Sequence, residues 1–281
     1  MIFAPKDLSE LCYILENKGD NYYILAGGTD LIIKIKNRKI VNYNIIEITK
    51  IEELKGFKED ADNYYIGPLM TMTEILNNEV IKENLKSLYE AAYKLGSNQI
   101  RNLATIGGNI ANASQSADCV LSLFALDAKI KILNSNEEEK IVPIDEFIIG
   151  REKTILESNE IISEIIIPKK RRINIFNKIG SRTGVTISKV SCAMSFDLNE
   201  DGSKDTRIFL GAVGIKPVRA EKLEKVFSSH DFKNIDLGLL QEIGYQEIEK
   251  AIPSRSSKYY KRVAIQGLLE DMLEELIYYE K

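Results

Sequence analysis

The segment "RNLATIGGNIANASQSAD", from Arg101 to Asp118, contains two adjacent glycines among small polar residues and ends on one carboxylate. It offers many backbone N–H groups and almost no side-chain bulk, so a ligand can approach its backbone closely. These properties predict a surface that lies against a ligand, and against a phosphate-bearing ligand in particular.

A second segment, "LAGGTDL" from Leu25 to Leu31, has the same design. In both segments a Gly-Gly pair follows an apolar stretch and precedes a small polar residue, and Thr29, Thr105 and Asn109 add side-chain hydrogen-bonding groups. Neither segment fits G-x-G-x-x-G or G-x-x-x-x-G-K-[ST], which disfavours a Rossmann site and a P-loop. A single Gly-Gly pair indicates a tight turn, whereas two similar Gly-Gly segments in one chain favour a pyrophosphate-binding site.

The length and charge of the chain limit the classes of protein to which it can belong. A chain of 281 residues predicts two or three sub-domains that share a long core. Its 38 basic and 42 acidic residues are interspersed, which argues against nucleic acid as a partner. No run of about 18 uncharged apolar residues occurs, and the first residues lack the pattern of a signal peptide. We therefore expect a cytoplasmic protein that does not attach to a membrane.

Cysteine and histidine are too scarce for several kinds of chemistry. Cys12, Cys119 and Cys192 are far apart and lack CxxC spacing, so we expect buried thiols and no metal or iron–sulfur site. The single histidine, His230, stands in a polar stretch and is expected to be a solvated loop residue. This argues against a catalytic triad and predicts that a bound cofactor carries any chemistry.

Hydrophobic spacing predicts alternating helices and strands, followed by a mostly helical C-terminal part. The charged stretch 168–174 is expected to be a domain boundary, and "NEDG" at 199–202 a hairpin turn. The expected helices are 8–15, 73–95, 119–128 and 256–281. The expected strands include 22–28, 44–49, 63–71 and 129–134.

Four stretches together, "AGGTDL", "IGPLMTMTEI", "RNLATIGGNIANASQSAD" and "ISKVSCAM", closely resemble the FAD-binding subunit of the xanthine dehydrogenase family of molybdenum hydroxylases. The likeness covers nearly the whole chain. It implies an α+β fold in which two FAD-binding sub-domains of the vanillyl-alcohol-oxidase (PCMH) type, 1–54 and 55–169, precede a C-terminal domain, 170–281. That last domain is expected to hold a three-stranded antiparallel sheet and helices.

The resemblance also implies which residues hold FAD. In the two loops and just beyond them these are Leu25, Ala26, Gly27, Gly28, Thr29, Asp30, Leu31, Thr105, Ile106, Gly107, Gly108, Asn109, Asn112 and Asp118. Asp118 is expected to accept hydrogen bonds from cofactor hydroxyls, and its alternative role is that of a helix N-cap.

Two further residues are assigned by the resemblance. Lys189 is expected near the pyrimidine edge of the flavin, where a cation stabilises the negative charge of the reduced ring. By pattern alone it is a surface lysine on an edge strand. Ile162 is expected to line the face of the ring, although by pattern alone it is a core residue.

The implied function is that of an electron-transfer subunit without catalytic or metal-binding residues of its own. Its implied partners are a 2Fe-2S subunit and a molybdopterin-binding subunit, with NAD or another acceptor as the outlet for electrons. The sequence also has Gln115 where many relatives have proline, which leaves the path of the loop there open, and it lacks the cysteine-rich insertion of the aromatic acyl-CoA branch. The alternatives are a self-sufficient flavin reductase on a related FAD-binding fold and a noncatalytic nucleotide-binding module.

Overall fold

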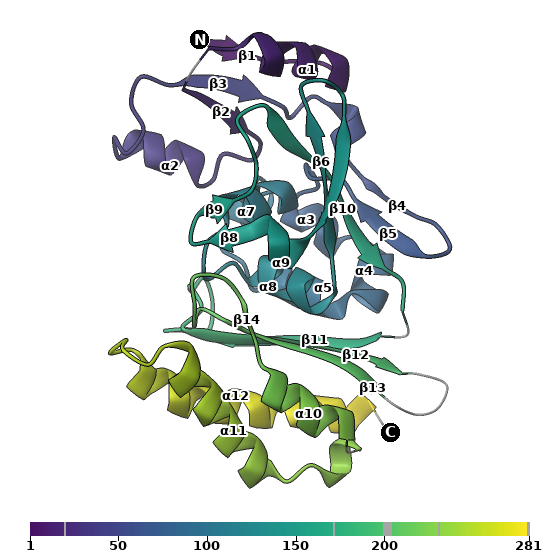
Figure 1. Ribbon diagram of the computed structural model, residues 1–281, viewed down its shortest axis with the longest axis vertical. Helices are drawn as coiled ribbons and strands as arrows, with labels where there is room; N and C mark the ends of the chain where they lie inside the picture. The colour runs from purple at the N-terminus through teal and green to yellow at the C-terminus, as the bar shows by residue number, and fades with distance from the viewer. Residues whose placement is uncertain (20, 171, 199–203, 230, 280–281) are drawn as a thin grey trace. The chain divides into compact units, whose positions relative to one another are not determined.

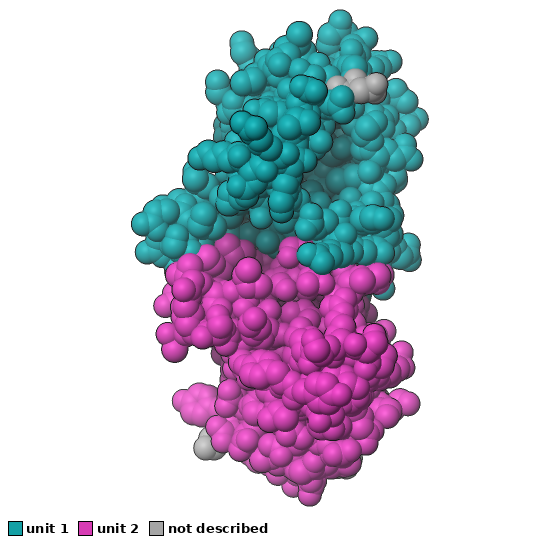
Figure 2. Space-filling model, turned by 90° about the vertical axis from the view of Figure 1, so that its left-hand side faces the viewer, with its two compact units in different colours: residues 1–77, 97–113, 127–169 teal, residues 78–96, 114–126, 170–281 magenta. Residues whose placement is uncertain are grey.

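The structure is a computed structural model that describes residues 1–19, 21–170, 172–198, 204–229 and 231–279. His230 and the turn predicted at 199–202 lie outside the described residues. The chain divides into two compact units: unit 1 comprises residues 1–77, 97–113 and 127–169, and unit 2 comprises residues 78–96, 114–126 and 170–281 (Figure 2). The domain boundaries expected from the sequence stay predictions.

The N-terminal part of unit 1 is a small parallel sheet of strand order β1-β3-β2. Its strands and the two helices that accompany them are β1 (Ile2–Phe3), α1 (Leu8–Asn17), β2 (Tyr22–Leu25), α2 (Leu31–Lys36) and β3 (Asn44–Glu47). Asp7 starts α1 as predicted, because its side chain accepts a hydrogen bond from the Glu10 amide at 2.8 Å. Leu11 and Leu15 on α1 pack with Ile46 of β3 in one buried cluster. The helix predicted at 8–15 is confirmed by α1, and β2 confirms the first part of the strand predicted over 22–28.

The rest of unit 1 is built on a five-stranded antiparallel sheet of order β4-β5-β10-β6-β7. The strands are β4 (Phe57–Glu59), β5 (Asn63–Ile66), β6 (Lys129–Asn134), β7 (Glu139–Pro143) and β10 (Glu160–Pro168). The isoleucine-rich β10 is central and mostly buried, as expected of a strand that has neighbours on both sides. The connections of unit 1 contain η1 (Glu52–Leu54), α3 (Met72–Leu76), α6 (Asn98–Arg101), α7 (Ile106–Asn112), α9 (Ile144–Phe147), β8 (Ile148–Gly150) and β9 (Lys153–Thr154).

The single helix predicted over 73–95 is wrong: α3, α4 (Glu79–Asn84) and α5 (Lys86–Tyr93) occupy this stretch. Asn78 begins α4, since its side chain accepts a hydrogen bond from the Ile81 amide at 3.0 Å. Leu85 then leaves the helical region, with φ −119° and ψ 49°. The first break falls at the junction between the two units, because α3 belongs to unit 1 and α4 and α5 belong to unit 2.

Unit 2 is a layered α/β structure around an antiparallel sheet of order β11-β12-β13-β14 (Figure 1). The fourth strand, β14, has two residues and extends the three-stranded sheet implied by the resemblance. Helices α5 and α8 cover one face and α10–α12 the other. The elements not yet bounded are α8 (Asp118–Ala125), β11 (Arg172–Ile179), β12 (Val190–Leu198), β13 (Lys204–Gly211), β14 (Val218–Arg219), α10 (Glu221–Ser229), η2 (Phe232–Asn234), α11 (Leu237–Ala251) and α12 (Lys258–Tyr279). The predicted short buried helix after residue 118 and the predicted terminal helix are confirmed by α8 and α12.

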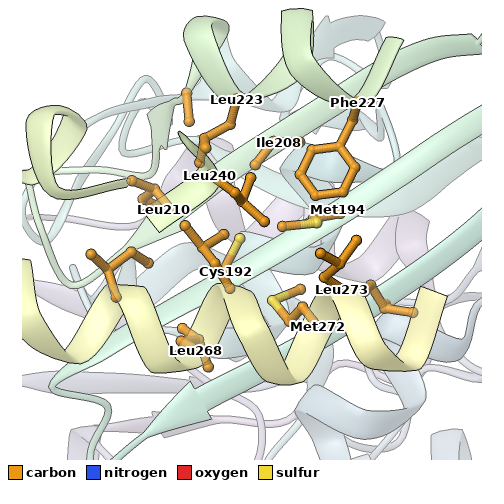
Figure 3. Packing of buried hydrophobic residues seen from close by; sticks show 14 of the residues in the cluster. Cys192, Met194, Ile208, Leu210, Leu223, Phe227, Leu240, Leu268, Met272 and Leu273 are labelled. Carbon is orange, nitrogen blue, oxygen red and sulfur yellow. The ribbon is translucent and has the colours of Figure 1, made fainter. Parts of the chain in front are cut away.

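Successive side chains of β12 point to opposite faces of the sheet, and those on one face form the core of unit 2. Cys192 and Met194 point toward α10–α12, where they meet apolar side chains such as Phe227 and Leu268 (Figure 3). The alternate residue Ser195 points to the other face, and its hydroxyl donates a hydrogen bond to the carbonyl of Ala125 in α8 at 2.5 Å. Small polar residues on that face let α8 lie close to the sheet.

The three cysteines are free and buried, which confirms the expectation of buried thiols. Within the described part of the chain, no helix combines the length and the apolar character needed to cross a membrane.

Candidate cofactor-binding site

Two glycine loops, the first at Leu25–Leu31 and the second at Thr105–Asn109, come together in unit 1. A Cβ atom on Gly27 would lie 1.8 Å from the carbonyl oxygen of Leu103, so the first loop touches the backbone that leads into the second. Gly28 has φ +70°, a conformation that favours glycine. The fold therefore places both loops at one position, although Leu103 lies 76 positions beyond Gly27 in the sequence (103 − 27).

The second glycine loop is hydrogen-bonded to the segment that follows β5. The amides of Ile106 and Gly107 donate hydrogen bonds to the carbonyls of Met70 and Pro68, at 3.0 and 2.9 Å. Gly107 is buried, and a Cβ atom there would lie 2.5 Å from the Pro68 Cβ atom. Gly107 therefore serves packing, and its absent side chain is needed by the protein itself.

Thr105 organises the remainder of the second glycine loop as the N-cap of α7. Its hydroxyl accepts a hydrogen bond from the Gly108 amide at 3.1 Å, and its carbonyl accepts one from the Asn109 amide at 3.0 Å. The amides of residues 106–109 are thus all used inside unit 1. Gly108 is exposed, so its missing side chain keeps the outer surface of this loop flat.

The first glycine loop differs, because its amides have no internal acceptors. Among the hydrogen bonds of the described residues, none is donated by a backbone amide of residues 26–31. The carbonyls of Gly28 and Asp30 do take part, since they accept from the amides of Ile32 and Lys34 at the start of α2. Successive amides without acceptors are suited to the oxygens of an anionic group.

Two asparagines on α7 complete this part of the site. The Oδ1 atom of Asn109 is buried and has no hydrogen-bond partner within the described structure, which leaves an acceptor for a ligand hydroxyl or N–H group. Asn112 is already engaged, because its Oδ1 atom accepts from Lys34 Nζ at 3.0 Å. This hydrogen bond ties α2 to α7, and an ion pair of Lys34 with Glu152 at 3.1 Å ties α2 to the turn between β8 and β9.

Ile162 lies in β10, also within unit 1. It pairs with Ile132 of β6, is buried, and stands where the register of the two strands shifts, between Ile162 and Glu164. A bulge of this kind re-aims side chains locally, but the observed burial is that of a core residue.

The other two predicted residues, Asp118 and Lys189, belong to unit 2. Ala117 is the N-cap of α8 and Asp118 its first helical residue, so the alternative role of Asp118 as N-cap does not hold. Its carboxylate lies 2.8 Å from Lys178 Nζ and accepts a hydrogen bond from the Ser188 hydroxyl at 2.6 Å. Burial raises the pKa of the Asp118 carboxyl, and the ammonium group of Lys178 opposes that rise. Lys189 is exposed and directly precedes β12.

The sequence interpretation missed Lys34, Lys178 and Ser188, which contact the predicted residues Asn112 and Asp118. Local pattern gives no signal for such partners, since Lys178 stands 60 residues beyond Asp118. Ser188 was within reach, because it lies inside the recognised stretch "ISKVSCAM".

The donors and acceptors of unit 1 fit a cofactor that carries a pyrophosphate and hydroxyl groups. The first glycine loop supplies open amides, and Asn109 supplies an unused acceptor. In the described ranges, no group of three or more His, Cys, Asp or Glu side chains could hold a metal ion.

Comparison with known proteins agrees with this chemistry over both parts of the chain. Residues 1–170 match the family described as the FAD binding domain in molybdopterin dehydrogenase, and residues 176–276 match the CO dehydrogenase flavoprotein C-terminal domain. The chain is 29% identical over 282 residues to the nicotinate dehydrogenase FAD-subunit of Eubacterium barkeri, covering 98% of this chain and 95% of that protein. It is 28% identical over 258 residues to the xanthine dehydrogenase FAD-binding subunit of Escherichia coli O157:H7, covering 90% and 88%.

Solved structures show the same fold. A chain of the carbon monoxide dehydrogenase of Hydrogenophaga pseudoflava superimposes with a TM-score of 0.84 at 26% identity, over 96% of this chain and 94% of that one. Quinoline 2-oxidoreductase of Pseudomonas putida 86 gives a TM-score of 0.84 at 21% identity, over 99% and 98%, which shows likeness of fold. The expected α+β architecture with an antiparallel C-terminal sheet and helices is confirmed.

Proposed function

The chain belongs to the FAD-binding subunits of the molybdenum hydroxylase family, and from this premise we propose that it passes electrons from 2Fe-2S clusters of a partner subunit to NAD or another acceptor. Its cofactor is FAD, and the chain is a component of an oxidoreductase. The observation that carries the proposal is the meeting of the two glycine loops at Gly27 and Leu103 within the FAD-binding part of the chain.

We assign the pyrophosphate of FAD to the first glycine loop, because the amides of residues 26–31 have no acceptors within the described structure. Asn109 is assigned to a hydroxyl or N–H group of the cofactor through its unpartnered Oδ1 atom. The second glycine loop contributes shape: Gly107 allows contact with Pro68, and the exposed Gly108 allows close approach of the ligand.

When bound, FAD supplies redox chemistry that accepts electrons singly and passes them on in pairs. The residues of this chain bind and orient it. Lys189 is proposed to lie at the pyrimidine edge, where its positive charge favours the reduced, more negative ring. The exposed position of Lys189 leaves its ammonium group accessible for that role.

The described residues contain no group that could hold a metal cluster, so we propose that the iron–sulfur and molybdopterin sites are supplied by partner subunits. The names of two relatives describe them as parts of larger enzymes, the nicotinate dehydrogenase FAD-subunit and the carbon monoxide dehydrogenase medium chain of Hydrogenophaga pseudoflava. Hydroxylation of the substrate would then occur on a partner subunit. This chain would transfer the electrons released there to the final acceptor.

Reconstitution with the iron–sulfur and molybdopterin subunits tests the proposal. Acceptor reduction driven by a hydroxylatable substrate is expected only in the assembled complex with FAD-loaded chain. The same complex assembled with FAD-depleted chain is the matched control and should retain substrate-driven cluster reduction while losing reduction of NAD. Full turnover by the isolated FAD-loaded chain would instead identify a self-sufficient reductase.

A further inference from the structure

Helix α2 and the turn that follows it form an apolar and basic surface of unit 1 that the proposed function does not use. Four of the six residues of α2 are leucine or isoleucine, yet none of its residues is buried. Ile33 is 55% exposed, and Val41, just beyond the helix, is 63% exposed. Figure 1 shows α2 outside the two sheets of unit 1. A helix this rich in apolar residues is normally covered, so its exposure indicates a surface that another molecule covers.

The same stretch is positively charged. Between Leu31 and Ile46 there are four basic residues and no acidic residue, whereas the whole chain has a formal net charge of −4. Lys36, Arg38 and Lys39 are exposed, and within the described ranges none of their side chains forms an ion pair or a hydrogen bond. Unpaired cations gathered on a chain of net negative charge attract a partner of opposite charge.

A neighbouring turn extends the positive charge. The ion pair of Lys34 with Glu152 places α2 beside the turn between β8 and β9. The bond with Lys34 holds the pKa of the Glu152 carboxyl below its ordinary value. The nearby positive charges of Arg151 and Lys39 lower this pKa further. One carboxylate therefore stands among three cations. We define the α2 surface by its exposed residues Ile33, Lys36, Arg38, Lys39, Val41 and Arg151.

We propose that the α2 surface is the docking site for an acidic, partly apolar surface of the iron–sulfur partner subunit. The inference rests on the proposed function, in which that subunit delivers electrons to the flavin. Leu31 is the last residue of the first glycine loop, to which the pyrophosphate is assigned, and the first residue of α2. A subunit that docks on α2 therefore lies close to the cofactor, which electron transfer requires because its rate falls steeply with distance.

Two other occupants fit the α2 surface less well. Membrane binding grows with the apolar area that is buried, and a helix of six residues offers little of it. A nucleic acid would be bound mainly through the cations and would leave Ile33 and Val41 without a role. An acidic protein surface uses both the charges, which steer association, and the apolar side chains, which supply contact area.

The test measures the affinity of the full FAD-loaded chain for the isolated iron–sulfur subunit. Lys36→Glu combined with Arg38→Glu reverses two charges, and Ile33→Asp replaces an apolar contact. All three side chains are exposed, so the fold and the FAD content should stay as in the parent. Residue 38 has φ +54°, and the strain of this conformation is similar for arginine and glutamate. The matched control, Lys129→Glu combined with Lys250→Glu, makes the same change in net charge at exposed positions elsewhere.

The double reversal on the α2 surface should weaken binding by about tenfold or more, mainly by slowing association. Ile33→Asp should weaken it by a similar factor, because it places a charge in an apolar contact. The control should keep the parent affinity within about twofold. Raising the salt concentration from about 0.05 to 0.3 M should weaken binding of the parent and the control more than binding of the double reversal. Substrate-driven acceptor reduction should recover at high concentrations of the variant chain, because the change weakens docking and leaves the flavin intact.

Parent affinity in both variants of the α2 surface would overturn the inference and leave the proposed function standing. The inference would also fail if the variants lost affinity only for the molybdopterin-binding subunit, or only for vesicles of anionic phospholipid, since either result identifies a different occupant. If the parent chain itself does not bind the iron–sulfur subunit at low salt, the proposed function and the inference fail together.

Discussion

Gly27 stands so close to Leu103 that any side chain at residue 27 would collide with the Leu103 carbonyl, 1.8 Å from the position of a Cβ atom. The contact is between two backbones, so no rotation of a side chain can relieve it. It brings the open amides of the first glycine loop next to the segment that carries Thr105 and Asn109. The pairing of the two loops, and with it the proposed site for one cofactor, depends on this glycine.

Gly27→Ala should therefore destabilise the protein by about 1–3 kcal/mol or more, because the two loop backbones must separate. Urea unfolding followed by circular dichroism measures the change. The matched control is Gly267→Ala, at an exposed position of α12 where a Cβ atom has no neighbour within 4 Å. Parent-like stability of Gly27→Ala would mean that the loops do not touch as described.

Gly108→Val should leave the protein folded but weaken FAD binding by about tenfold or more, because it places a branched side chain on the exposed surface of the second glycine loop. The nearest atom to the new Cβ is Thr105 Oγ1 at 2.9 Å, so the cost to stability is that of a disturbed N-cap, about 1 kcal/mol.

Binding is measured by titrating FAD into flavin-free protein and following fluorescence. Gly267→Val is the matched control, whereas Gly56 is unsuited to that purpose because its φ of +81° strains any other residue. Parent affinity in a folded Gly108→Val protein would remove the second glycine loop from the cofactor site.

Lys189→Met should retain FAD yet lower its reduction potential, because the reduced ring loses a nearby positive charge. An exposed charge contributes about 1 kcal/mol at close range, which corresponds to a shift of about 20 mV for a two-electron couple. Dye-coupled redox titration gives the value, and Lys189→Arg should keep it near that of the parent. If Lys189→Met has the parent potential at full FAD occupancy, Lys189 does not face the flavin.

The thiols of Cys119 and Cys192 should not react with Ellman's reagent in the native protein at pH 8. Burial raises the pKa of both, and a thiol must ionise before it reacts. Cys12 is buried as well, and burial raises the pKa of its thiol too. All three should react once guanidinium unfolds the chain, and a fast stoichiometric reaction before unfolding would be inconsistent with the described core.

The elements that sequence predicts well are those with a local signal. Asp7 caps α1, and the apolar run after Asp118 forms the buried helix α8. The division of 73–95 into three helices also had a local signal, the capping asparagine Asn78, which helical periodicity obscured. At this crossing from unit 1 to unit 2, the helix-capping residue therefore predicts the structure better than the helical spacing of the apolar residues.

The site was predictable as a set of residues but not as a set of contacts. The Gly-Gly pairs mark both loops, yet nothing local shows that Gly107 serves Pro68 while Gly108 stays exposed. Likewise the carboxylate of Asp118 could be singled out by its position, whereas its partner Lys178 is set by the approach of β11 to α8. Such pairings arise from tertiary packing between distant parts of the chain.

The most direct measurement is the identity of the flavin held by the purified chain of 281 residues. Heat denaturation releases a noncovalent flavin, and chromatography against standards distinguishes FAD from FMN. We predict FAD at about one molecule per chain, because the open amides of the first glycine loop suit a pyrophosphate, which a mononucleotide lacks. Release of FMN alone, or failure of the folded chain to take up FAD, would contradict the account.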